Sequence, residues 1–123
     1  MRRVLVSERD SLLRELIREW LAEGGAEALW PEAPAPERGD IDAILVDVAC
    51  QQQAHGVLTS WRARYPRAAI VVASARFSPA DTANDAMANR LGVMRVLAKP
   101  FTRDDLWAAL GLPNLPANHL PSR

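Results

Sequence analysis

The sequence predicts a single α/β domain in which helices cover both faces of a parallel β-sheet. Short apolar runs alternate with segments whose apolar residues recur at helical spacing, which is the pattern of βαβ units. Some of these runs are apolar at nearly every position, as in strands that are buried on both faces. The chain of 123 residues suffices for one such domain and leaves no room for a second.

The first predicted strand is 2–7, RRVLVS, and a helix follows from about residue 10 to residue 23. One face of this helix is apolar and consists of Leu12, Leu13, Leu16, Ile17, Trp20 and Leu21. Asp10 or Ser11 is the expected N-cap, because its side chain can accept a hydrogen bond from a free backbone amide. The pair Gly24-Gly25 is expected to end the helix.

A short second strand is predicted at 26–30, and the proline-rich stretch 31–40 follows it. Because proline opposes a regular helix, the second helix is expected to be shortened to about one turn or lost to a loop. The third strand, 41–47, is nearly all apolar and is expected at the centre of the sheet. After a polar loop at 49–56, a helix is predicted from about 57 to 65.

The fourth predicted strand, 68–73, leads to a helix that Ser78 caps and that runs from Pro79 to about Leu91. The fifth strand is 93–98. A capping box starts the last helix, and Gly111 ends it; the box consists of Thr102 and Asp105. The domain is therefore expected to span 1–111, followed by a proline-rich tail at 112–123.

Charge and cysteine content limit the classes of function. Fifteen basic residues balance fifteen acidic ones without forming a basic patch, so we do not expect nucleic acid as a direct ligand. Cys50 is the only cysteine and the N-terminus is too charged for a signal peptide, so we expect a cytoplasmic protein. The apolar runs are too short to cross a membrane.

Charged and polar side chains stand where four of the predicted strands end. They are Glu8 and Arg9 after the first strand, Asp47 after the third, Ser74 after the fourth and Lys99 after the fifth. Parallel strands that neighbour each other end at the same edge of a sheet, and open α/β sheets build their sites there. We therefore expect these side chains to lie close together.

The segments VLVSERDSLLREL, ILVD, VVASA and VLAKPF resemble, in order and spacing, the receiver domains of two-component response regulators. The resemblance covers residues 2–110, and its specificity lies in the conjunction of the four strand ends. It implies a doubly wound five-stranded sheet in the order 2-1-3-4-5 and a signalling role rather than an enzyme. The bond Lys99-Pro100 resembles one that is usually cis in receivers.

By this resemblance, a histidine kinase or a phosphotransfer protein would transfer a phosphoryl group to Asp47, with Mg²⁺ as cofactor. Lys99 would pair with one phosphoryl oxygen, and the Ser74 hydroxyl would donate a hydrogen bond to another. Glu8 and Asp47 would hold the metal, together with a backbone carbonyl near Ala49. Cations are needed because the attacking carboxylate approaches a group that is already negative.

Arg9 departs from the family, because receivers carry the second acidic residue of the first strand end at this position. At about 4 Å and an effective dielectric near 20, one charge interaction amounts to about 4 kcal/mol, comparable with a weak Mg²⁺ binding energy. An inward Arg9 would leave Mg²⁺ binding weak or lost, or would pair with Asp47 or Glu8; an outward Arg9 would extend into solvent. A second departure is Val96, which replaces the aromatic residue that turns inward when receivers switch.

Two other functions remain open. One is a pseudo-receiver, a phosphorylation-independent binding module in which Arg9 replaces a metal ligand. The other is a small hydrolase that uses Asp47 with His55, although the sequence lacks a nucleophile elbow. Cys50 and His55 make only a weak case for a metal site, since no third ligand accompanies them.

A purely structural role for the strand-end residues is also open, because residues such as Lys99 and Ser74 are often only solvated or part of a turn. The four tryptophans are expected in or near the core. The expected partner surface is 79–110, where receivers often form homodimers; its charged residues are Arg90, Arg95, Arg103 and Asp104.

Overall fold

Five parallel strands form one sheet in the computed structural model, which describes residues 2–33, 40–49, 51–83 and 85–113. The strands are β1 (Arg2–Ser7), β2 (Ala26–Leu29), β3 (Ala43–Asp47), β4 (Ala69–Ser74) and β5 (Arg95–Ala98). Their order is β2-β1-β3-β4-β5, and every neighbouring pair is parallel. The fold class implied by the resemblance is confirmed, and the strands match the predicted ranges to within two residues.

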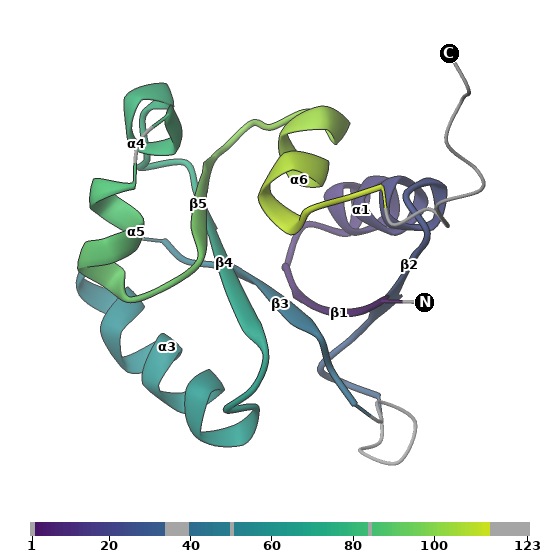
Figure 1. Cartoon of the computed structure of the whole chain (residues 1–123), viewed down its shortest axis with the longest axis horizontal. Helices are drawn as coiled ribbons and strands as arrows, with labels where there is room; N and C mark the ends of the chain where they lie inside the picture. The colour runs from purple at the N-terminus through teal and green to yellow at the C-terminus, as the bar shows by residue number, and fades with distance from the viewer. Residues whose placement is uncertain (1, 34–39, 50, 84, 114–123) are drawn as a thin grey trace.

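Helices cover both faces of the sheet, as Figure 1 shows. They are α1 (Ser11–Glu23), α3 (Gln51–Arg64), α4 (Pro79–Ala83), α5 (Ala86–Leu91) and α6 (Arg103–Leu110). The helices α1 and α6 bury the first core, α3 and α5 bury the second core on the opposite face, and α4 lies beside the edge strand β5. Along β3, Leu45 belongs to the first core while Ile44 and Val46 belong to the second, as the period of two in a strand requires.

Three predicted helix starts are confirmed. The Asp10 carboxylate accepts hydrogen bonds from the backbone amides of Leu12 and Leu13, at 2.9 and 3.1 Å. At α4, the Ser78 hydroxyl and the Asp81 carboxylate each accept from the other's backbone amide. At α6, Thr102 and Asp105 form the predicted capping box. Each cap satisfies backbone amides that have no partner inside the helix.

The prediction of a polar loop at 49–56 is wrong, because α3 begins at Gln51. Ala54, Leu58 and Trp61 are buried against the second core at spacings of four and three residues, which is one helical face. Glutamine is a good helix former, and Gly56 lies on an exposed side where a Cβ would meet nothing within 4 Å. Neither the glutamines nor the glycine therefore prevents the helix from starting early.

The prediction of one helix from Pro79 to Leu91 is also wrong, because the structure has two, α4 and α5. The two segments pack against different parts of the sheet. In α4, the Thr82 hydroxyl accepts a hydrogen bond from the backbone amide of Ala98 at the edge strand, at 3.1 Å. In α5, Met87 and Ala88 are buried in the second core. A single straight helix would not make both sets of contacts.

Three predictions concern residues that lie outside the described ones. They are the shortened second helix within 31–40, of which 34–39 are not described, the thiol of Cys50, and most of the tail 112–123. Among the residues that are described, no helix is both long enough and apolar enough to span a bilayer.

Candidate functional site

The carboxyl ends of four strands meet at one edge of the sheet and carry the predicted site residues. The register aligns Asp47 of β3 with Ala73 of β4, and Ser74 of β4 with Ala98 of β5. Glu8 directly follows β1, and Lys99 directly follows β5. The Lys99-Pro100 peptide bond is cis, in agreement with the resemblance.

The Lys99 ammonium bridges two carboxylates. Its Nζ donates hydrogen bonds to Glu8 Oε1 and to Asp47 Oδ1, each at 3.0 Å. The Glu8 side chain is 4% exposed, while the side chains of Lys99 and Asp47 are 20% and 25% exposed. Burial lowers the pKa of Lys99, but its hydrogen bonds to Asp47 and Glu8 outweigh burial and raise the pKa above its ordinary value. Lys99 is therefore a structural part of the site rather than a solvated residue.

The two carboxylates are held differently. Glu8 Oε2 accepts hydrogen bonds from the backbone amides of Arg9 and Asp10, both at 3.1 Å, so both oxygens of Glu8 have protein partners. Asp47 Oδ2 has no hydrogen-bond partner within the described part of the chain. Asp47 thus keeps one carboxylate oxygen without a described protein partner, whereas both Glu8 oxygens accept hydrogen bonds and could reach a ligand only through their remaining lone pairs.

Ser74 is buried, with 1% of its surface exposed. Its hydroxyl oxygen accepts a hydrogen bond from the backbone amide of Arg76 at 3.1 Å, and its carbonyl accepts one from the backbone amide of Lys99 at 3.0 Å. No hydrogen bond joins Ser74 to Asp47 among the described residues. The structure brings Ser74 to the correct edge of the sheet, with its hydroxyl engaged in a turn.

Arg9 is exposed, and within residues 2–33, 40–49, 51–83 and 85–113 it forms no ion pair with Asp47 or Glu8. Of the arrangements considered for Arg9, the structure shows the one that extends into solvent. Its backbone amide donates a hydrogen bond to Glu8 Oε2, and its side chain is left available. Val96 is 3% exposed and belongs to the second core, so an apolar side chain fills that position.

The proposed pairing of Asp47 with His55 finds no support in the contacts. His55 is exposed on α3, and no hydrogen bond or ion pair joins it to Asp47 among the residues that the structure describes. The tryptophans lie in or near the core as expected: Trp61 is buried in the second core, Trp20 and Trp30 pack against the first, and Trp107 is partly buried, its Nε1 donating to the Trp20 carbonyl.

Arg76 and an apolar groove are the features that the sequence analysis missed. Arg76 is exposed and lies two residues after Ser74, at the same edge of the sheet. Its position in the loop after β4 is the signal that would have identified it. The groove, of about 440 Å³, runs along α1 from Lys99, and its walls include Leu12, Leu16, Trp20 and Phe101. Leu12 is 72% exposed there.

The acidic donors suit a weak Mg²⁺ site that a phosphoryl group would strengthen. No group of three or more His, Cys, Asp or Glu side chains suited to a metal is found among the described residues. Mg²⁺ is, however, commonly bound by one or two carboxylates together with phosphate oxygens, and it keeps several waters. Asp47 offers a free oxygen, and Glu8 lies on the other side of the shared ammonium. This set suits a weak site that is completed by a ligand's oxygens.

No protein-family model and no curated protein matches the chain. Solved structures do. A response regulator from Thermotoga maritima is 20% identical with a TM-score of 0.70, and the match covers 90% of this chain and 95% of that one. The receiver domain of a sensor histidine kinase from Pseudomonas aeruginosa, with magnesium in its active-site cleft, is 24% identical with a TM-score of 0.63, over 89% of this chain and 93% of that one.

A response regulator from Burkholderia pseudomallei, whose structure contains a phosphorylated aspartic acid, is 19% identical with a TM-score of 0.66. That match covers 89% of this chain and 66% of the other. Each of the three similarities covers about nine tenths of this chain. At these identities they establish the fold, which is that of receiver domains.

Proposed function

We propose that this chain is a receiver module of two-component signalling, in which Asp47 accepts a phosphoryl group from a phosphohistidine of a kinase or phosphotransfer protein. One observation carries the proposal. Asp47 has a free, partly exposed carboxylate oxygen, while the Lys99 ammonium is 3.0 Å from the other oxygen of the same carboxylate. The similarity in fold to a protein with a phosphorylated aspartic acid supports the same role.

The proposed reaction is an in-line displacement at phosphorus. The free oxygen of Asp47 attacks and forms a new O–P bond, while the P–N bond to the donor imidazole breaks. The imidazole nitrogen leaves with the electron pair and takes up a proton. Lys99 would stabilise the negative charge that gathers on the phosphoryl oxygens. The Ser74 hydroxyl, whose oxygen accepts from the Arg76 amide, would donate a hydrogen bond to one of them.

Glu8 and Asp47 are the residues that would hold a magnesium ion. When bound, Mg²⁺ would supply positive charge that offsets repulsion between the carboxylate and the incoming phosphoryl group. The magnesium in the similar Pseudomonas receiver domain supports this cofactor. The proposal requires only a weak site, since a phosphodonor brings further oxygen ligands.

Acetyl phosphate, a small phosphodonor, tests the proposed function. After incubation with acetyl phosphate and Mg²⁺, intact-mass spectrometry should show one added phosphoryl group on the wild-type protein. Asp47→Asn should remove the adduct, because an amide is not a nucleophile for this step. Lys99→Met should reduce the rate at least about tenfold, since it removes charge stabilisation worth about 1.5–3 kcal/mol. An adduct of equal yield in Asp47→Asn would contradict the assignment.

A pseudo-receiver is the second candidate function, and Arg9 is the observation that favours it. Arg9 replaces an acidic position, and Lys99 already neutralises Glu8 and Asp47 in part. Mg²⁺ titration followed by tryptophan fluorescence distinguishes the two, because Trp20 lines the groove that begins at Lys99. Saturable binding in the millimolar range would count against the pseudo-receiver.

The face formed by α4, β5 and α6 is the proposed contact with a second copy of the chain. The four charged residues predicted there are exposed, but three of them already have partners: Arg95 is 3.4 Å from Asp85, and Arg103 is 3.3 Å from both Glu23 and Asp104. Sedimentation equilibrium with and without acetyl phosphate tests this contact. A monomer under both conditions at high concentration would exclude it.

A further inference from the structure

We propose that Arg9 and Arg76 form a guanidinium clamp on either side of Asp47, which binds a phosphoryl group with little help from Mg²⁺. The inference rests on the proposed function, because the bound group is the one that Asp47 would accept. The two arginines would thus replace, in charge, the divalent cation whose acidic ligand the chain lacks.

The sheet order places the two arginines on opposite sides of the acceptor. β3, which ends at Asp47, lies between β1 and β4. Arg9 stands just beyond β1 and Arg76 just beyond β4. The backbone amide of Arg9 binds Glu8 Oε2, and the backbone amide of Arg76 binds the Ser74 hydroxyl, each at 3.1 Å. Each arginine is therefore fixed through its main chain to a side chain of the site.

Both guanidinium groups are available for a ligand. Arg9 and Arg76 are exposed, and in the part of the chain that the structure describes neither side chain forms an ion pair or a hydrogen bond. Several other arginines, by contrast, have carboxylate partners: Arg14, Arg18, Arg95 and Arg103. A guanidinium presents a planar fork of donors that suits phosphate oxygens, and a long side chain lets it reach them.

The charges of the site show why such a clamp is needed. Lys99 is shared between Glu8 and Asp47, so one ammonium already faces two carboxylates. A phosphoryl group on Asp47 adds negative charge that Lys99 alone does not balance. Two guanidinium groups supply the same formal charge as one divalent cation. Replacing an acid by Arg9 removes a metal ligand and adds a cation in a single step.

The test uses beryllofluoride, a phosphoryl-group analogue, in metal-depleted buffer and in buffer with millimolar Mg²⁺. Binding is followed by tryptophan fluorescence, since Trp20 lines the groove beside Lys99. For the wild type, we expect dissociation constants within about tenfold of each other in the two buffers. For Arg9→Ala with Arg76→Ala, we expect at least about tenfold weaker binding without Mg²⁺ and recovery with Mg²⁺.

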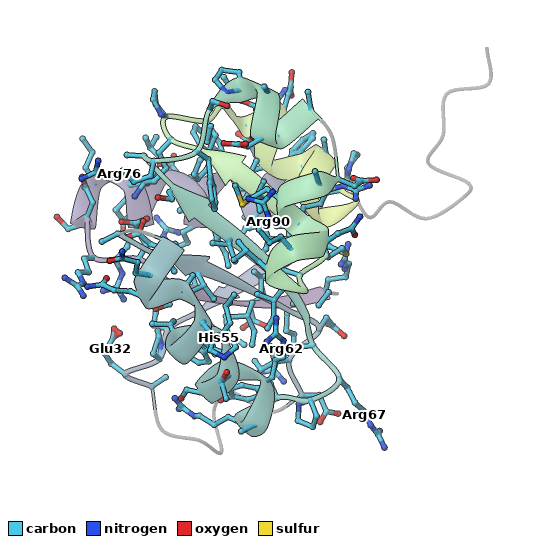
Figure 2. The ribbon with its side chains drawn as sticks, turned by 90° about the vertical axis from the view of Figure 1, so that its left-hand side faces the viewer. Glu32, His55, Arg62, Arg67, Arg76 and Arg90 are labelled. Atoms are coloured by element: carbon cyan, nitrogen blue, oxygen red, sulfur yellow. The ribbon has the colours of Figure 1, made fainter. Side chains whose placement is uncertain are left out.

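Arg67→Ala is the matched control, because Arg67 is also exposed and Figure 2 shows it at the end of the molecule opposite Arg76. It should bind like the wild type in both buffers. Replacing both clamp residues by lysine should give intermediate binding, since the charges remain but the planar fork is lost. Asp47→Ala should abolish binding throughout.

The clamp proposal is wrong if Mg²⁺ strengthens beryllofluoride binding as much in the wild type as in the double alanine variant. It is also wrong if the wild type binds beryllofluoride in neither buffer. An Asp47-dependent phosphoryl adduct together with either result would leave the proposed function intact and remove the clamp. Conversely, arginine-dependent beryllofluoride binding without any adduct from acetyl phosphate would support the clamp and contradict phosphoryl transfer.

Discussion

Lys99 connects the two carboxylates of the site and is the only lysine in the sequence. Lys99→Met should destabilise the protein by about 1–3 kcal/mol at neutral pH, because it leaves the nearly buried Glu8 without a cation. Urea denaturation measures the loss. In Lys99→Met combined with Glu8→Gln, the loss should be smaller than in the single variant; an equal or larger loss would show that Glu8 does not depend on Lys99.

The raised pKa of Lys99 predicts how stability changes at high pH. A group whose pKa is higher in the folded state stabilises the fold fully below its unfolded value, which is about 10.5, and loses that contribution as pH rises through the folded value. The difference in unfolding free energy between wild type and Lys99→Met should therefore shrink between about pH 9 and pH 12. A difference that stays constant over this range would contradict the ammonium's role.

For single residues, the sequence predicted where the site residues lie in the fold but not how their side chains are oriented. Strand ends placed Glu8, Asp47 and Lys99 together, because neighbouring parallel strands finish at one edge. The direction of the long Arg9 side chain depends on rotamers that no pattern fixes. The bond between the Arg76 amide and the Ser74 hydroxyl is likewise a property of one loop conformation.

Among the elements, helix starts with a capping pair were predictable, and the other boundaries were less so. Asp10 and the Thr102 capping box mark α1 and α6 through local hydrogen bonds. No side-chain cap is described at the start of α3 at Gln51. The only sign of the early start is the buried Ala54, and a single small residue adds little to the apolar periodicity that predicts a helix. The break between α4 and α5 arises from packing against β5, which is a tertiary effect.

Arg62 links two helices of the second face. From α3, its guanidinium donates hydrogen bonds to the carbonyls of Leu91 and Gly92 at the end of α5, at 2.6 and 2.9 Å. Arg62→Met should cost about 1–2 kcal/mol, since it removes a cation from carbonyls that have no helical partner. Arg90→Met on α5 is the control, because Arg90 is exposed. Equal urea midpoints for the two variants would rule out this capping role.

For the whole molecule, the alternation of apolar strands and helices was enough to predict the α/β architecture without any knowledge of the site. Central strands such as β3 and β4 contribute residues to both cores, so their register is fixed by burial on two faces. The sheet order followed from a family resemblance, and the similar solved structures share that fold at 24% identity or less. The fold therefore tolerates wide sequence change.

The most direct measurement compares phosphoryl incorporation in the wild type and in Arg9→Asp, with acetyl phosphate, Mg²⁺ and intact-mass analysis. Because Arg9 extends into solvent and leaves Asp47 with a free oxygen, we expect an Asp47-dependent adduct in both proteins, with rates within about tenfold of each other. An adduct that forms only in Arg9→Asp would contradict the account and identify the chain as a pseudo-receiver.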